Sequence, residues 1–142
     1  MAYVFAWEDG ERLEMTGGDL PRGWRILVDP RNTGSGHLSM GNQDIPAGGG
    51  IPVHRHEKEE EILFIHEGRA EIEIDGRRFA ARAGTTAFLP VNVPHGLRNS
   101  GDGPLRLVWV FSPPGYESVF REMAARNLDH GAIEDRLGLG RP

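Results

Sequence analysis

The sequence predicts an all-β domain with a short α-helix near its C-terminal end. The first observation is composition: the 142 residues include 20 glycines and 10 prolines, a share above average usage that favours many short elements joined by turns. The second is pattern: short segments alternate apolar and polar residues and end at Gly, Pro, Asn or Asp, as strands do. Because the sequence shows no repeat or linker, residues 1–142 are expected to form one domain.

Two strands are expected before residue 46. Residues 24–28 alternate apolar and polar side chains until Asp29-Pro30 ends the run. Farther along, Leu38 and Met40 lie two residues apart and are expected on one inward face, before a loop over residues 46–50.

The middle of the chain contains the clearest strand patterns. Residues 62–65 are apolar throughout, as expected for a strand that is covered on both faces. Residues 69–74 alternate cleanly, Asp75-Gly76 is a strong two-residue turn signal, and residues 77–81 return, which predicts a β-hairpin. Three side chains of this hairpin are expected to face inward: Ala70, Ile72 and Ile74.

Three further strands complete the predicted β-region. Residues 85–89 follow Gly84, and after a turn bracketed by prolines His95, Leu97 and Asn99 share one face of the next strand. The last strand carries an alternating apolar face made of Leu105, Leu107, Trp109 and Phe111.

The period changes after the segment Ser112-Pro113-Pro114-Gly115. Four apolar residues then recur at helical spacing with charged residues between them: Tyr116, Val119, Phe120 and Met123. This spacing predicts a short amphipathic helix that ends near Asn127. From His130 onward the chain is polar and Gly-rich, so we expect a further helical turn and a loose tail, and helix and tail together occupy about residues 113–142.

Charge and composition exclude several classes of protein. The net charge of −5 and the lack of a basic block argue against a general nucleic-acid binder. No stretch approaches the length of a membrane span, and Met1–Gly10 lacks the pattern of a signal peptide, so we expect a soluble, cytoplasmic protein. With no cysteine in the chain, disulfides, thiolate metal sites and cysteine nucleophiles are excluded. Its 16 basic residues are 15 arginines and Lys58, a bias that suggests a high-GC bacterial genome.

Two histidines separated by one residue are the most informative feature. In a strand, His54 and His56 point to the same face, which places two imidazoles in chelating geometry. An acidic run over residues 57–61 follows, any member of which could return to the same site, and His95 arrives later. Imidazoles together with a carboxylate suit a divalent first-row metal better than calcium or magnesium.

These residues stand at the spacing of the two motifs of the cupin superfamily, which the chain resembles. The first motif is matched by Gly48, His54, His56, Glu61 and Gly68. The second is matched by Gly84, Pro90, His95 and Asn99. Asn92 stands where the second motif has glycine, and asparagine tolerates the left-handed conformation that this turn requires. The motifs span residues 48–99, and the flanking segments also look like the small, single-domain, quercetin dioxygenase-like cupins.

The resemblance implies a double-stranded β-helix, a jelly-roll-like barrel, that holds one divalent transition metal: iron, manganese, nickel, copper or zinc. By resemblance its ligands are His54, His56, Glu61 and His95. Strand alternation alone allows more than one acid of the run, and the distance to Gly68 selects Glu61.

The same register decides which side chains of residues 62–65 face the barrel. Leu63 and Ile65 are expected inside, and Ile62 and Phe64 outside, where they need cover. Cupins commonly cover such a face by dimerising, so the resemblance implies a homodimer.

Three functions fit such a site. The first is a small-molecule dioxygenase of the quercetinase or diketone-cleaving type, in which Glu61 also serves as the catalytic base. The second is an isomerase, dehydratase or lyase that uses the metal as a Lewis acid. It needs a separate acid or base, for example Tyr3, Glu8 or Asp44. The third is a module that binds a small molecule without turning it over. No hydrolase, Walker or dinucleotide motif accompanies the serines and glycines.

The remaining candidates are assigned to the pocket wall or to the surface. Five apolar side chains are expected to face inward as core and as pocket wall: Met40, Phe88, Leu97, Trp109 and Phe111. The histidines outside the motifs, His37, His66 and His130, are expected to be solvated or to lie at an interface.

Overall fold

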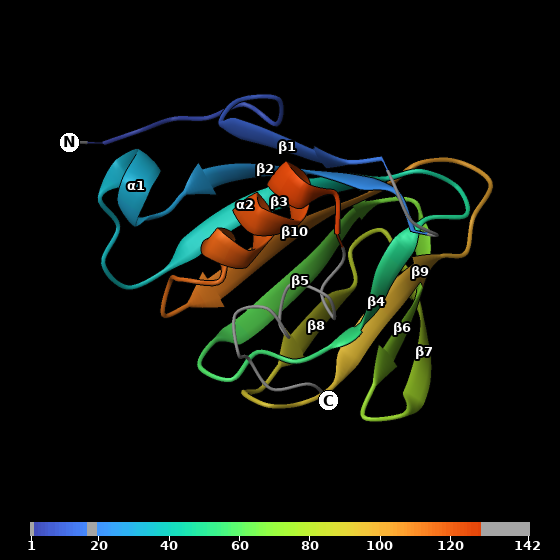
Figure 1. The fold of residues 1–142 in the computed structure, drawn as a ribbon. Coiled ribbons are helices and arrows are strands. Elements are labelled where there is room, and N and C mark those ends of the chain that lie inside the picture. Colours follow the sequence, from blue (N-terminus) through green and yellow to red (C-terminus); the bar gives the residue numbers. More distant parts are fainter. Residues whose placement is uncertain (1, 17–19, 129–142) are drawn as a thin grey trace.

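The protein folds into two antiparallel sheets that face each other, as the computed structural model in Figure 1 shows. The structure describes residues 2–16 and 20–128. The large sheet has the strand order β1 (Glu11–Met15), β2 (Arg22–Val28), β3 (Ser39–Ile45), β10 (Leu105–Ser112), β5 (Glu60–Glu67) and β8 (Thr86–Leu89). The small sheet has the order β4 (Gly50–His54), β9 (His95–Asn99), β6 (Arg69–Ile74) and β7 (Arg77–Arg82). With the helices α1 (Pro30–Thr33) and α2 (Glu117–Arg126), this confirms the predicted all-β class with a C-terminal helix.

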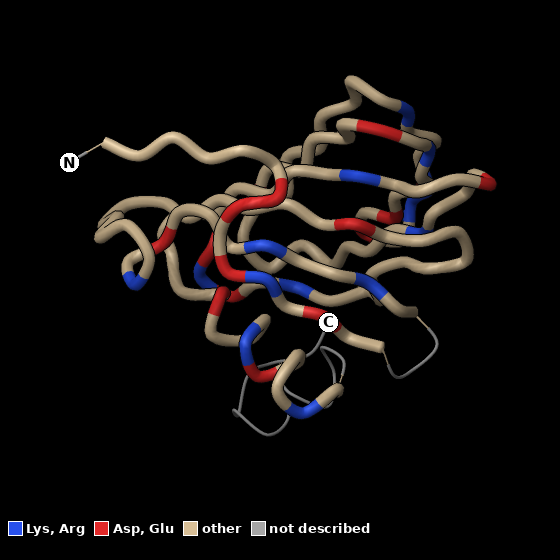
Figure 2. The backbone as a smooth tube through the Cα atoms, turned by 90° about the horizontal axis from the view of Figure 1, so that it is seen from above, with Lys and Arg blue, Asp and Glu red and all other residues tan. Residues whose placement is uncertain are grey.

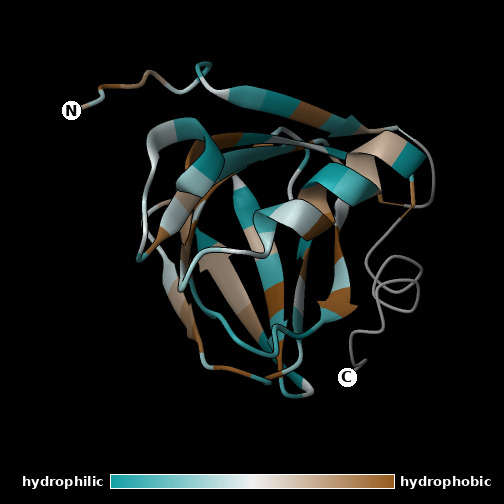
Figure 3. Cartoon of the chain, turned by 60° about the vertical axis from the view of Figure 1, so that its left-hand side comes forward, coloured by the Kyte–Doolittle hydropathy of each residue, from teal (hydrophilic) through white to brown (hydrophobic). Residues whose placement is uncertain are grey.

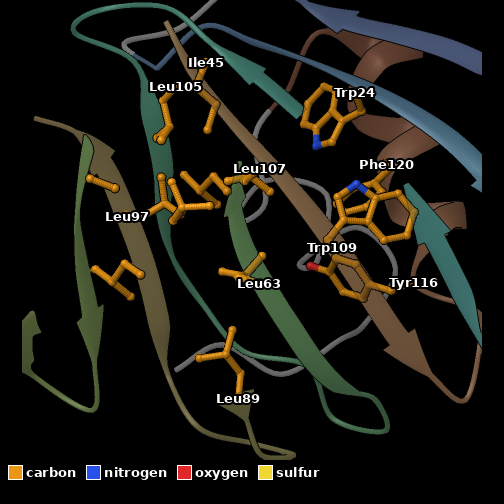
Figure 4. Close-up of a cluster of buried hydrophobic side chains, with 14 of the residues drawn as sticks. Trp24, Ile45, Leu63, Leu89, Leu97, Leu105, Leu107, Trp109, Tyr116 and Phe120 are labelled. Atoms are coloured by element: carbon orange, nitrogen blue, oxygen red, sulfur yellow. The ribbon is translucent and has the colours of Figure 1, made fainter. Parts of the chain in front are cut away.

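The core lies between the two sheets. Strand β10 pairs with β3 on one side and β5 on the other, so segments far apart in sequence form one continuous inner face. The predicted apolar face of β10 is confirmed, because its alternate residues Leu105, Leu107, Trp109 and Phe111 are all at most 1% exposed. Figure 4 shows Trp24, Trp109, Tyr116 and Phe120 grouped at one end of this core.

The expected face of β3 was wrong. Met40 lies on the outer face, partly exposed, while Ser39, Gly41 and Gln43 are buried on the inner face. The physical reason is space: a Cβ atom on Gly41 would overlap the indole ring of Trp109 and the carbonyl oxygen of Arg25. The neighbouring Trp109 therefore determines which face of β3 points inward, and the apolar pattern of the strand itself does not determine it.

The predicted hairpin is confirmed between β6 and β7. Asp75 and Gly76 both have positive φ, 49° and 77°, which is the backbone of a type I′ turn. Ala70 and Ile72 are buried as expected, and Ile74 packs against the core while remaining partly exposed.

The predicted C-terminal helix is confirmed as α2, and Asn127 ends it in the left-handed conformation. Its apolar stripe packs on the large sheet: the ring of Phe120 lies 5.6 Å from Trp24 and 5.2 Å from Trp109, between centroids. Figure 3 shows hydrophilic and hydrophobic residues side by side on this helix, as expected for an amphipathic element. The expected structure of the segment from His130 onward lies outside the described residues.

Charged residues of both signs are interspersed along the backbone in Figure 2. Among the residues that the structure describes, no helix has the length and apolar character needed to cross a bilayer.

Candidate metal centre

Three histidines meet at the paired strands β4 and β9. His54 ends β4 directly opposite His95, the first residue of β9, and His56 follows two residues later. Each is at most 5% exposed. One ring nitrogen from each histidine lies within 4.8 Å of the others. This is a compact arrangement of donors that could hold one metal ion.

Local hydrogen bonds fix how two of the rings are oriented. His54 donates its Nδ1–H to the carbonyl of Pro52 at 2.8 Å, and His95 donates its Nδ1–H to the carbonyl of Val93 at 2.9 Å. A carbonyl can only accept, so the proton of each neutral ring resides on Nδ1 and the lone pair stays on Nε2. This is the tautomer that a metal ligand needs.

Burial also keeps the imidazoles neutral. Removal from water lowers the pKa of His56 to about 4 and lowers the pKa of His95 from its ordinary value, because the charged form is poorly solvated. At neutral pH both rings are therefore ready to donate a lone pair without first losing a proton.

The structure brings Glu61 to these histidines. Its Oε2 lies 2.9 Å from Nε2 of His56 and 3.9 Å from Nε2 of His95, while Glu60 on the other face of β5 is exposed. Burial raises the pKa of Glu61 to about 7. The choice of Glu61 from the acidic run thus agrees with its position, and its role as a ligand stays a prediction.

The donor atoms fit a cation. Among the described residues, the buried Nε2 of His95 has no hydrogen-bond partner, and the polar neighbour of the buried Nε2 of His56 is the candidate ligand Glu61. Buried polar atoms without partners are uncommon and call for an explanation such as an ion. Two neutral imidazoles and a carboxylate form a mixed nitrogen and oxygen set that iron, manganese, nickel, copper or zinc would accept.

A small cavity of about 10 Å³ adjoins these groups, which is room for about one water molecule or one coordinated atom. Its lining consists of Gln43, Ile51, His54, Glu61, Leu63, His95, Gly96, Leu97 and Phe120. The lining is mostly apolar, so a group bound here is shielded from water.

The structure places three of the five side chains expected at the pocket wall inside the protein and two outside. Leu97 lines the cavity, Trp109 is buried beside Phe120, and the ring of Phe111 lies 4.9 Å from that of His56. Met40 does not reach the site, for the reason given above, and the inward placement of Phe88 was also wrong. Phe88 is 56% exposed.

Strand register explains the position of Phe88. It pairs with Ile62, and Ile62 faces outward. Leu89, the next residue of β8, pairs with Glu61 and is fully buried. The face of β8 is therefore set by its partner strand.

Sequence reasoning did not place Gln43 or Ile51 in the site, and it assigned Phe120 only to the stripe of the helix. Tyr116, also assigned only to that stripe, lies with its ring centroid 4.0 Å from that of His56. One signal could have indicated the orientation of Gln43: residues two apart in a strand share a face, and the apolar Ile45, two residues later, is buried.

The other sequence-based candidates lie away from the centre. Tyr3 and Glu8 are exposed, and Asp44 on the outer face of β3 pairs with Arg25 and Arg106. These groups supply no acid or base to the site. Of the remaining histidines, His37 is exposed, His66 stacks on Trp7, and His130 lies outside the described residues.

The turn before β9 has the expected conformation. Asn92, which stands in place of a glycine, adopts a φ of 64°, in the left-handed region that asparagine tolerates. The ligand spacing of the second motif is therefore preserved.

Comparison with known proteins places this geometry in a family. Residues 41–111 match the sequence pattern of the cupin domain. The chain is 36% identical over 97 residues to "Polyketide synthase CurC" of Streptomyces cyaneus, an alignment that covers 68% of this chain and 60% of that protein. It is 30% identical over 112 residues to "Protein SchB" of Streptomyces halstedii, covering 79% of this chain and 78% of that protein.

A solved structure supports the fold. The polyketide cyclase RemF from Streptomyces resistomycificus superposes with a TM-score of 0.65 at 24% identity, over 80% of this chain and 83% of that one. The motif spacing, the two facing sheets and the matched sequence pattern lead to the same assignment. The chain belongs to the cupin family.

Proposed function

We propose that this cupin binds one divalent transition metal on His54, His56, Glu61 and His95 and promotes non-redox chemistry on a small enolisable polycarbonyl compound. The observation that carries the proposal is the convergence of three buried imidazoles and the buried carboxylate of Glu61, with the Nε2 of His95 unpartnered among the described residues. The names of two similar proteins, a polyketide synthase protein and a polyketide cyclase, support the substrate class. Ring closure by an aldol reaction is the reaction type that such compounds favour.

A bound metal would supply Lewis acidity, polarising a carbonyl oxygen and making the adjacent C–H more acidic. The protein's own groups supply the rest. The carbonyls of Pro52 and Val93 hold the rings of His54 and His95 in one tautomer. Oε2 of Glu61, which lies beside Nε2 of His56 and Nε2 of His95, is placed to accept a proton from a bound compound.

The apolar lining protects the reacting groups. Leu63, Leu97 and Phe120 border the cavity and exclude bulk water from it. In an aldol ring closure, the carbon that loses its proton forms the new bond to a second carbonyl carbon, and the oxygen of that carbonyl then takes up a proton to give a hydroxyl group. That hydroxyl group leaves as water together with a second proton from the attacking carbon, which gives the unsaturated ring. Exclusion of water keeps the enolate from being reprotonated before the new carbon–carbon bond forms.

The dioxygenase of the sequence-based analysis is the second candidate. The same donor set accepts iron, manganese, nickel or copper, and Glu61 beside the histidines suits a base in either reaction. Oxygen consumption separates the two candidates, because ring closure with loss of water needs none.

The test begins with metal content. The protein is purified without a histidine tag or chelating column, its metal is measured by elemental analysis, and a triketone substrate is incubated with it under nitrogen and in air. We expect near-stoichiometric metal and a cyclised product, lighter by one water, in both atmospheres. Product only in air with matching oxygen uptake would establish the dioxygenase instead. Absence of metal after reconstitution would overturn the site.

Variants locate the metal. His54→Ala and His95→Ala are expected to lose most bound metal, whereas the control His66→Ala, which removes a ring stacked on Trp7, is expected to keep it. Full metal content in either of the first two variants would contradict the assignment.

We also propose that the chain forms a homodimer, because apolar side chains stay exposed on the outer face of β5 and β8. The exposed fractions are 42% for Ile62, 38% for Phe64 and 56% for Phe88.

A further inference from the structure

One polar side chain in the cavity has no assigned role. Gln43, on the inner face of β3, is 3% exposed and lines the same cavity as His54, Glu61 and His95. Within the described part of the chain, its Oε1 accepts no hydrogen bond. An amide oxygen that is buried and unpartnered lowers stability, so an apolar side chain would serve a purely packing role better.

The position of Gln43 relative to the histidines is informative. Gln43 comes from the large sheet, and His54 and His95 come from the small sheet, so the two sheets contribute opposite walls of one cavity. The cavity has room for about one water molecule or one coordinated atom. A group held at the histidines therefore shares this space with the side chain of Gln43.

We propose that Gln43 is a positioning residue that accepts a hydrogen bond from the exogenous ligand of the metal. The inference rests on the proposed metal site and adds a preference to it. Oxygen ligands that carry an O–H or N–H beside the coordinating oxygen, as an enol does, bind in preference to ligands that lack this donor. The unpartnered Oε1 is an acceptor, so only a donor on the ligand satisfies it.

A structural role is the competing explanation. Trp24 is the cross-strand neighbour of Gln43, and its indole N–H also lacks a partner among the described residues. If Gln43 serves Trp24, then replacing it lowers stability and leaves ligand preference unchanged. If it serves a ligand, replacement changes ligand preference and does not lower the stability of the metal-free chain.

The experiment uses the full chain loaded with Co²⁺, whose visible absorption reports on the ligands. Two probes are titrated: acetohydroxamic acid, and N-methylacetohydroxamic acid, which has the same two coordinating oxygens but no N–H. Both are measured with the wild type, with Gln43→Met, which has a similar shape and no amide, and with Gln43→Leu in case the first variant folds poorly.

We expect the wild type to prefer the N–H probe by about tenfold, the scale of one hydrogen bond. The preference should fall to about twofold or less in either variant. Any steric effect of the added methyl group persists in the variants, so it cannot produce this difference. Ser39→Ala is the matched control: Ser39 is buried on the same face of β3 but does not border the cavity, so the preference should remain.

Three results would overturn the inference. An equal preference in wild type and Gln43→Met, with Co²⁺ bound by both, contradicts the role of Gln43 and leaves the metal site standing. Failure of both probes to alter the Co²⁺ spectrum of the wild type also contradicts it. Absence of Co²⁺ binding by the wild type contradicts the proposed function together with this inference.

Discussion

At the scale of single residues, the chemistry of the candidate centre depends on which side-chain atoms carry protons. His54 and His95 use the same local device, a hydrogen bond from Nδ1 to the carbonyl two residues earlier in the chain. Their Nε2 lone pairs are thereby left for the cavity. Glu61 stands within 4 Å of two imidazoles through a single oxygen, Oε2.

Replacement of neighbouring glutamates tests the carboxylate assignment. Glu61→Gln is expected to weaken metal binding by about 100-fold, since loss of a ligand should equal or exceed the 10- to 100-fold cost of removing an outer partner. Glu60→Gln, on the exposed face of the same strand, is expected to change affinity by less than about twofold. Competition with a chromophoric chelator measures both. Equal losses, or a larger loss in the second variant, would show that the wrong carboxylate was chosen.

A second prediction at this scale concerns Gly41. Gly41→Ala forces a methyl group into the indole of Trp109 and the backbone of Arg25, so we expect the free energy of unfolding to fall by about 2 kcal/mol. Gly103→Ala is the control, because a Cβ there meets open space. Urea unfolding compares the two variants. A Gly41 variant as stable as wild type would mean that Trp109 repacks easily.

Ion pairs hold helix α2 against the N-terminal part of the described chain. Arg121 donates to Glu11 of β1 at 2.7 Å and to Asp29 at 2.6 Å, where Asp29 caps α1. Phe120, the residue before Arg121, lines the cavity beside the candidate metal centre. The ion cluster therefore holds in place the helix that closes one side of the site.

This cluster predicts a pH dependence. The hydrogen bond from Arg121 lowers the pKa of Glu11 below its ordinary 4.5. A lowered folded-state pKa adds stability above the unfolded value, and this stability is lost as the pH falls through the folded value. Arg121→Met is thus expected to cost about 2 kcal/mol at neutral pH, and less once Glu11 is protonated.

Urea unfolding of the wild type and of Arg121→Met, at neutral pH and well below pH 4.5, checks this prediction. The gap between the two proteins should narrow in acid. Arg126→Met is the control, because the exposed Arg126 pairs with the half-exposed Glu122 one turn earlier in the same helix, and its loss should cost less than about 0.5 kcal/mol. A gap that is constant or wider in acid would contradict the role of Glu11.

At the scale of the whole molecule, alternation predicted strand faces where the strand itself was strongly patterned. It succeeded for β10 and for β5, where Leu63 and Ile65 are buried as expected. It failed where a neighbouring strand determines which face points inward. Gly41 faces the core because Trp109 occupies the space there, which leaves Met40 on the outer face. Phe88 faces outward because its partner Ile62 does. A period of two gives the faces of a strand, and only its neighbours decide which face is inside.

The site shows the same division between local and non-local information. The spacing of the motif residues along the chain was sufficient to predict that the motif histidines and Glu61 lie together. Gln43 was not identified, because the sequence gives no sign of which face of its strand it occupies, and the cavity that it borders is formed by several elements. Non-local packing therefore limited the prediction of the cavity lining more than the prediction of the histidine cluster.

The outer face of the large sheet is an apolar surface at the edge strand β8. Ile62 pairs directly with Phe88 on one side and with Val110 on the other, and Phe64 lies two residues from Ile62 on the same face. Contiguous exposed apolar side chains on a folded chain mark an interaction surface. An edge strand with this character also needs protection from unwanted pairing, which a specific dimer provides.

Light scattering coupled to size exclusion tests the homodimer. The wild type is expected to have twice the 15.7 kDa mass of one chain, and the double variant Phe64→Glu, Phe88→Glu is expected to have the mass of one chain with an unchanged circular dichroism spectrum. Both side chains are exposed, so charges there disrupt an interface and leave the core intact. Phe79→Glu is the control, since Phe79 is 43% exposed on β7 of the other sheet and should leave the dimer intact. A wild-type monomer, or dissociation caused only by the Phe79 variant, would show that this face is not the interface.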